Sequence, residues 1–250
     1  MSADLGENEQ TPRRGIYLLP NFFTTSALFA GFFAIISAMK GAFPAAAIAV
    51  YVAMVADSLD GRIARLTNTQ TAFGAEYDSL SDLIAFGAAP ALIAYCWSLR
   101  NLGKFGWLAA FFYTAATALR LARFNVQTTE KRYFYGLPCT SAAPFIVGMI
   151  WLQSIYHVNM NNSWVGIATA TALVMMGLLM TSTIRYRSFK DLEVSGPSSF
   201  FPILLILLFF VGVTLDPPEV LFGIFTCYML SGPLVWGWQL LTRKKPRSSR

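Results

Sequence analysis

Long apolar runs alternate with short polar segments along almost the whole chain. Eight runs approach the length of about 20 residues that an α-helix needs to cross a hydrocarbon layer of roughly 30 Å. They cover residues 17–39, 43–62, 78–98, 105–124, 141–157, 164–182, 199–215 and 219–241. The fifth and seventh runs are the shortest. The pattern predicts an all-α polytopic membrane bundle of about eight transmembrane helices, with both termini on one side of the membrane.

The composition supports a membrane protein with a single domain. Apolar residues make up 55% of the 250 residues and charged residues only 13%, whereas a soluble domain carries about 25% charged residues. We expect one membrane domain at residues 16–242, a polar N-terminal segment at 1–15 and a basic tail at 243–250. The first apolar run continues too far to be the core of a cleaved signal peptide.

The basic residues indicate which side the termini occupy. If the N-terminus is cytoplasmic, only Lys40, Arg100 and Lys104 of the 19 lysines and arginines fall in outer loops. Cytoplasmic loops of membrane proteins are enriched in lysine and arginine. We therefore predict cytoplasmic termini. The net charge of +6 then reflects topology, and no nucleic-acid partner is expected.

The cysteines and the single histidine offer little chemistry. Cys96, Cys139 and Cys227 have the spacing of neither a disulfide framework nor a zinc site, and we interpret them as buried small hydrophobic residues. His157 falls in a predicted outer loop, where a solvated side chain is the expected state.

Four aspartates interrupt the apolar pattern at the facing ends of the second and third runs. Asp57 and Asp60 are three residues apart, and Asp78 and Asp82 are four apart, so each pair projects from one helix face. The second helix would run inward and the third back outward. A short polar turn at 67–71 would bring both pairs together at the cytoplasmic surface. Carboxylates at membrane depth persist only with a compensating partner.

A divalent cation is the partner that best suits these carboxylates. Oxygen ligands without nearby histidine or cysteine favour Mg²⁺ or Mn²⁺, as one ion or two, with Ca²⁺ as an alternative. Such ions keep open positions that phosphate oxygens fill. The sequence therefore predicts a metal site that binds a phosphate or diphosphate.

Five further residues are candidates for binding that phosphate-containing ligand. Gly61 and Gly74 would let a ligand approach the backbone, although small residues also serve close helix packing. Arg65 carries a guanidinium fork suited to phosphate oxygens. Asn21 and Thr24 share one face of the first run and serve either ligand binding or contacts between helices.

A second anion site is predicted at the end of the fourth run. Arg120 and Arg123 lie three residues apart on one helix face, at the same depth as the aspartates. The alternative is that both arginines only anchor the helix at the cytoplasmic surface.

The motif D-x2-D-G-x2-A-R-x8-G-x3-D-x3-D resembles the signature of the CDP-alcohol phosphotransferase family. Its eight fixed positions are all matched, by Asp57, Asp60, Gly61, Ala64, Arg65, Gly74, Asp78 and Asp82. The resemblance implies an enzyme that transfers a substituted phosphate from a CDP-linked donor to an alcohol and releases CMP. It also implies that Asp57, Asp60 and Asp78 bind metal, that Asp82 is a ligand, the general base or both, and that Gly61 and Arg65 bind the CDP portion.

Three other segments, at 120–125, 134–141 and 182–190, are similar to the bacterial and archaeal phosphatidylserine synthase branch of the family. The branch implies CDP-diacylglycerol as donor and L-serine as acceptor, with Arg120 or Arg123 binding the serine carboxylate. We also expect a homodimer in the cytoplasmic membrane of a bacterium or archaeon, with the active site facing the cytoplasm. Cys139 and Thr140 stand where this branch usually has Ser-Pro.

Three alternatives stay open. Phosphatidylglycerophosphate or phosphatidylinositol-phosphate synthesis would share the metal site and differ in the acceptor, and the chemistry of the residues alone does not choose between them. Membrane prenyltransferases also use two aspartate-rich motifs, but on well-separated helices, whereas Asp60 and Asp78 are 18 residues apart. A cation transporter would place its charged residues toward the middle of the membrane.

Overall fold

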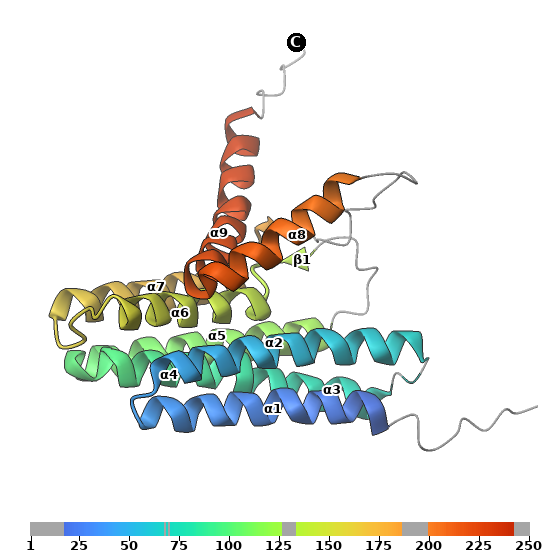
Figure 1. Ribbon diagram of the computed structural model, residues 1–250, viewed down its shortest axis with the longest axis horizontal. Helices are drawn as coiled ribbons and strands as arrows, with labels where there is room; N and C mark the ends of the chain where they lie inside the picture. Colours follow the sequence, from blue (N-terminus) through green and yellow to red (C-terminus); the bar gives the residue numbers. More distant parts are fainter. Residues whose placement is uncertain (1–17, 68, 70, 127–133, 187–199, 243–250) are drawn as a thin grey trace, which may run out of the picture.

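The computed structural model describes residues 18–67, 69, 71–126, 134–186 and 200–242, and these residues are almost entirely helical (Figure 1). The elements are α1 (Leu18–Met39), α2 (Phe43–Leu66), α3 (Ala72–Asp82), η1 (Leu83–Ala88), α4 (Ala89–Trp97), η2 (Leu99–Leu102), α5 (Lys104–Val126), β1 (Phe134–Tyr135), α6 (Cys139–Ile155), α7 (Ser163–Thr181), β2 (Arg185–Tyr186), α8 (Phe200–Leu215) and α9 (Pro217–Thr242). The segments predicted at 1–15 and 243–250 lie outside the described residues.

The helices match the predicted apolar runs closely. Because α3, η1 and α4 follow one another without a break, they form one long helix, and the described part of the chain then contains eight long helices, as predicted. Six of these are long and apolar enough to cross a membrane, so the chain is an integral membrane protein. The other two, α6 and α8, have 17 and 16 residues and correspond to the two shortest predicted runs.

The boundaries of the second and third helices differ from the prediction. Helix α2 continues to Leu66, and α3 begins at Ala72, six residues before the predicted start at Asp78. Thr71 caps α3, because its side chain accepts a hydrogen bond from the backbone N–H of Gly74 at 3.0 Å. Hydropathy marks the part of a helix that lies in the membrane, and therefore missed the polar turns that extend both helices beyond it.

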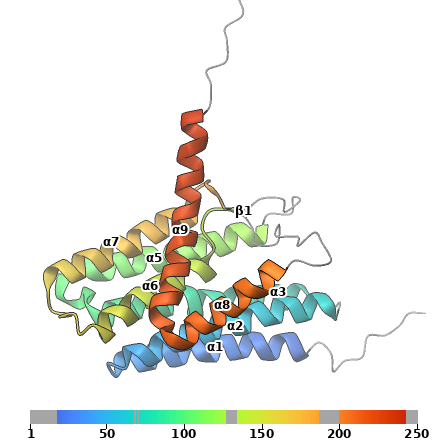
Figure 2. The same ribbon diagram turned by 45° about the horizontal axis from the view of Figure 1, so that its top comes forward.

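The axes of α1 to α7 are roughly parallel or antiparallel to one another. Helix α9 stands at a steep angle to them, and α8 crosses them obliquely (Figures 1 and 2). Alanines of α1 and α2 make up much of the core: Ala27, Ala30, Ala34, Ala38, Ala46, Ala47, Ala49 and Ala53. Small side chains let helix backbones approach closely in membranes. At Gly31 the backbones of α1 and η1 lie close together, since an added Cβ would lie 2.7 Å from Cα of Ala85.

The two short strands fix the start of α6. They pair antiparallel, with Phe134 opposite Tyr186 and Tyr135 opposite Arg185. Gly136 follows with a φ of 81°, and its N–H donates to the Ile184 carbonyl at 2.8 Å. A side chain at Gly136 would collide with the Met180 carbonyl. This connection directs the chain into α6, so that Cys139 enters the bundle beside α5.

The three cysteines are free, but only Cys139 is buried. The prediction that all three are buried small hydrophobic residues was wrong for Cys227, which is exposed, and for Cys96, which is half-buried. A polarizable side chain is equally compatible with lipid and with a protein core. His157 lies in an exposed turn after α6, as expected of a solvated residue.

Candidate active site

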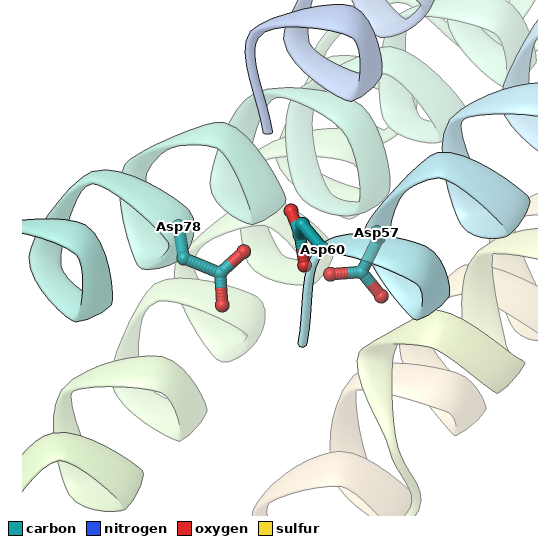
Figure 3. Close-up of side chains that lie close together, drawn as sticks. All are labelled: Asp57, Asp60 and Asp78. Atoms are coloured by element: carbon teal, nitrogen blue, oxygen red, sulfur yellow. The ribbon is translucent and has the colours of Figure 1, made fainter. Parts of the chain in front are cut away.

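Three of the four predicted carboxylates converge between α2 and α3. Asp57 and Asp60 come from α2 and Asp78 from α3, and one carboxylate oxygen from each lies within 4.8 Å of the others (Figure 3). Asp60 is buried, whereas Asp57 and Asp78 are half-buried. The aspartates therefore point toward one another, as the helical spacing and the antiparallel hairpin predicted.

The separation of these oxygens suits a divalent cation. Two oxygens bound to one ion lie at most twice the metal–oxygen distance apart, which is about 4.2 Å for Mg²⁺ and about 5 Å for Ca²⁺. An arrangement within 4.8 Å meets this limit for Ca²⁺ and needs only a slight contraction for Mg²⁺. The residues present therefore fit a hard cation with oxygen ligands.

Asp82 lies beside this cluster, outside the group of three. It is one turn after Asp78 and close enough to Asp57 for the two carboxyl groups to share a hydrogen bond. Its side chain is buried. Asp82 thus touches the cluster through Asp57 from the side of the bundle interior.

Helix α1 is tied to both carboxylate-bearing helices. The Thr24 hydroxyl donates to Oδ2 of Asp60 at 2.8 Å, and the Ser81 hydroxyl donates to the Thr24 carbonyl at 3.0 Å. All three side chains are buried. Thr24 therefore joins α1 to α3, which is the predicted contact between helices, and it also orients a carboxylate of the cluster, a role that the sequence did not indicate.

A cavity of about 250 Å³ adjoins the cluster. Its lining includes Asp60, Asp78 and all five predicted ligand-binding residues, Asn21, Thr24, Gly61, Arg65 and Gly74. An added Cβ at Gly61 would meet no atom within 4 Å, so packing against another described helix does not explain this glycine. Its missing side chain instead leaves the α2 backbone open toward the cavity.

The turn between α2 and α3 adds hydroxyl groups that sequence reasoning missed. Thr69 and Thr71 also line the cavity, and the Thr69 hydroxyl lies 2.7 Å from that of Thr67. The alternation of threonines at 67, 69 and 71 was the available clue. From the sequence alone, this segment is only a polar turn between two helices.

The two predicted anion-binding arginines have different surroundings. Arg120 is half-buried on α5, within hydrogen-bonding reach of the Cys139 thiol at the start of α6. Cys139 is in turn close to Asp82, which places Arg120 near the carboxylates. Arg123 lies in the exposed last turn of α5.

Asn125 is a further residue near the site that the sequence did not single out. Its amide donates to Oγ of Ser79 at 3.0 Å and to Oε2 of Glu76 at 3.3 Å. Ser79 follows Asp78 directly, so these bonds fasten α3 to α5 next to a carboxylate of the cluster. A lone asparagine at a helix end carries no pattern that would have revealed this.

Comparisons with known proteins agree with the motif. A family model described as CDP-alcohol phosphatidyltransferase matches residues 17–229. A CDP-diacylglycerol--serine O-phosphatidyltransferase of Helicobacter pylori is 39% identical over 227 residues, which are 90% of this chain and 93% of that protein. A protein of the same name from Methanocaldococcus jannaschii is 36% identical over 57% of this chain and 63% of its own length. Another from Saccharomyces cerevisiae is 32% identical over 53% of this chain and 53% of its own length. The predicted resemblance is confirmed, and the chain belongs to the CDP-alcohol phosphatidyltransferase family.

Proposed function

We propose that this protein transfers the phosphatidyl group from CDP-diacylglycerol to the hydroxyl of L-serine and releases CMP. The observation that carries the proposal is the convergence of Asp57, Asp60 and Asp78 beside a cavity lined by Gly61 and Arg65. Serine as the acceptor is supported by the printed names of the relatives from bacteria, an archaeon and yeast.

The metal in this proposal is Mg²⁺ or Mn²⁺, as one ion or two, with Ca²⁺ as an alternative. Asp57, Asp60 and Asp78 would hold it, with Asp82 as a fourth ligand. A bound divalent ion would neutralise charge on the donor diphosphate and on the departing CMP. The Thr24 hydroxyl restrains the Asp60 carboxylate, so this ligand needs little reorganisation when a cation binds.

The nucleotide part of the donor would occupy the cavity. Gly61 and Gly74 leave room for the ligand, and the Arg65 guanidinium would bind phosphate oxygens through two parallel hydrogen bonds. Asn21 and Thr24 of α1 also line the cavity. A cavity of about 250 Å³ admits only part of this lipid, which leaves the acyl chains in the bilayer.

In the proposed reaction the serine hydroxyl attacks the phosphorus that bears diacylglycerol. A bond forms between the serine oxygen and that phosphorus, and the bond from phosphorus to the bridging diphosphate oxygen breaks, so that CMP leaves with the electron pair. The Asp82 carboxylate would accept the hydroxyl proton as general base. Arg120 or Arg123 would bind the serine carboxylate. Phosphoryl transfer depends mainly on positioning and electrostatics, so no covalent nucleophile is required.

The proposed setting is the cytoplasmic membrane of a bacterium or archaeon, with the site facing the cytoplasm. Asp60 lies about 26 Å along α2 from Phe43, near one surface of the hydrocarbon layer. Arg62, Arg65 and Arg123 are exposed at this same end of the bundle, which supports a cytoplasmic surface. We also propose that residues 16–242 act as one domain and that the protein is a homodimer.

An assay with alternative acceptors tests the proposal. Purified protein is given CDP-diacylglycerol, Mn²⁺ and, separately, L-serine, glycerol 3-phosphate or inositol phosphate, and CMP release is measured. We expect release with L-serine only. Release that does not depend on serine would overturn the acceptor assignment, and ion flux through vesicles without CMP release would favour a transporter.

A further inference from the structure

The helix that carries Asp78 and Asp82 changes its winding directly after Asp82. In η1 the N–H of Ala89 donates to the carbonyl of Ile84, five residues earlier, which defines one π-helical turn. Such turns are rare and occur frequently at functional sites. The widened turn therefore lies at the point where the carboxylate-bearing segment joins the membrane-embedded α4.

Pro90 provides a local cause for the π turn. Proline has no N–H, and its ring clashes with the carbonyl four residues earlier. That carbonyl belongs to Phe86, which consequently lacks its α-helical donor in the middle of η1. A buried carbonyl group needs another partner.

Tyr113 of α5 supplies this partner. Its hydroxyl donates to the Phe86 carbonyl at 3.0 Å, and both side chains are completely buried. The bond crosses from one membrane helix to another and ends inside the π turn. Tyr113 therefore compensates the carbonyl group that Pro90 deprives of its α-helical donor.

The π turn also sets the direction of the two aspartates. Helix α4 buries Ala89, Pro90, Ala91, Ile93, Ala94 and Trp97. On an uninterrupted α-helix, this buried face would point about 90° away from Asp78 and Asp82. One extra residue in a turn rotates the preceding segment by about 100°. With η1, the carboxylates and the buried face of α4 lie on the same side of the helix.

We propose that Tyr113 is a positioning residue for the carboxylate cluster. By holding the Phe86 carbonyl, it keeps η1 in its wide form and keeps Asp78 and Asp82 turned toward Asp57. The catalytic part of this inference rests on the proposed function, whereas the effect on cation binding does not. Without the hydroxyl, the buried Phe86 carbonyl loses its partner, and the aspartates on the preceding turns lose their fixed direction.

The variant Tyr113→Phe tests the inference, with Tyr51→Phe as a matched control. Tyr51 is also buried, and its hydroxyl donates to the Pro144 carbonyl of α6 at 2.9 Å. Each substitution removes one hydroxyl from one helix carbonyl, so both variants should lose similar thermal stability. Mn²⁺ binding to the purified proteins is measured by electron paramagnetic resonance, and CMP release is measured in parallel.

We expect Tyr113→Phe to weaken Mn²⁺ binding and to lower kcat about ten-fold or more, because a small misplacement of reacting groups has effects of this size. The KM for CDP-diacylglycerol should change little. Tyr51→Phe should match the unsubstituted protein in Mn²⁺ affinity and kcat. Unchanged Mn²⁺ affinity in Tyr113→Phe, or equal losses in both variants, would overturn the inference. If the unsubstituted protein binds Mn²⁺ but releases no CMP, the proposed function fails and the Mn²⁺ comparison still decides the role of Tyr113.

A double variant separates positioning from folding. Adding Pro90→Ala to Tyr113→Phe restores an N–H that can reach the Phe86 carbonyl in a regular α-helix. We expect the double variant to regain thermal stability but not Mn²⁺ affinity, since a regular helix turns Asp78 and Asp82 away. Recovery of both properties would show that Tyr113 contributes only to stability.

Discussion

The region around α1, α2 and α3 and the hairpin of α8 and α9 are held in different ways. Near the carboxylates, side-chain hydrogen bonds join separate helices, at Thr24 to Asp60, Thr25 to Tyr77 and Asn125 to Ser79. The described side chains of α8 are mostly exposed apolar groups, including Leu207, Leu208 and Phe210. Helix α9 contacts mainly α6.

The described side-chain hydrogen bonds that join the hairpin to the rest of the protein involve α9. The Tyr186 hydroxyl donates to the Met229 carbonyl at 3.3 Å. The Tyr156 hydroxyl donates to the Glu219 carboxylate, and this bond raises the pKa of Tyr156 above its ordinary value. Neither contact reaches the carboxylate cluster.

Helices that carry charged groups and helices that face lipid have different structural requirements. A cluster of carboxylates at membrane depth is stable only in a particular geometry with particular partners. A lipid-facing helix needs only apolar side chains, because lipid tails are as apolar as leucine. Substitutions should therefore have large functional effects in the first region and small ones in the second.

The largest effect is expected from Asp60→Asn. The amide removes one negative charge and one strong ligand from the buried centre of the cluster. We expect Mn²⁺ binding to be lost and CMP release to fall by more than about 10⁴-fold, since metal ions contribute several kcal/mol to such reactions. Asp216→Asn, at an exposed acid before α9, is the control and should leave both properties unchanged. Normal Mn²⁺ affinity in Asp60→Asn would remove this aspartate from the metal site.

Asp82→Asn should lower turnover strongly, with less effect on donor binding. An amide cannot accept the serine proton, and loss of a general base lowers rates by about 10² to 10⁴-fold. Binding of CDP-diacylglycerol, measured by calorimetry in the presence of Mn²⁺, should stay close to that of the unsubstituted protein. The role of base would be excluded by undiminished turnover, whereas lost donor binding would favour a ligand role.

Replacing Thr24 should have a smaller, graded effect. Thr24→Val removes the hydroxyl that donates to Asp60, and hydrogen bonds to charged groups contribute about 1.5 to 3 kcal/mol. We expect Mn²⁺ affinity to fall about ten-fold or more. Thr24→Ser keeps the hydroxyl and should retain most of the affinity. Equal losses in Thr24→Val and Thr24→Ser would indicate that the methyl group matters more than the hydrogen bond.

Most of the fold and the carboxylate cluster followed from local patterns. The lengths of apolar runs predict the helices, and spacings of three and four residues predict which aspartates share a face. The π turn did not follow, although Pro90 marked a weak point in the helix. Tyr113 and Gly31 contact this turn, at the Phe86 carbonyl and at Ala85, and both residues are distant in sequence from η1.

The contact between Arg120 and Cys139 also could not be predicted from local sequence patterns. The sequence predicts equivalent roles for Arg120 and Arg123, because a helical spacing of three places both on one face. The connection through Gly136 brings the start of α6 against α5, and only Arg120 reaches Cys139. Long-range contacts of this kind distinguish residues that a local pattern treats as equal.

The smallest effect is expected in α8. Phe210 has 63% of its surface exposed, so Phe210→Ala exchanges a contact with lipid for another contact with lipid. Specific activity and thermal stability in lipid nanodiscs should both stay within experimental error. Phe145→Ala is the matched comparison, since Phe145 is buried and its ring stacks on Phe222 of α9 at 5.2 Å. Loss of a buried phenylalanine costs about 3 to 5 kcal/mol, so this variant should unfold at a lower temperature.

The outcome for Phe210→Ala also bears on the proposed homodimer. If α8 faces only lipid, the molar mass of the purified protein stays the same after the substitution. If α8 packs against a second copy, Phe210→Ala leaves a cavity in that interface, and light scattering should detect a shift toward monomer. Stability should then fall toward that of Phe145→Ala. The hairpin would in that case be a protein interface and not a lipid-facing element, and both regions would depend on specific contacts between side chains.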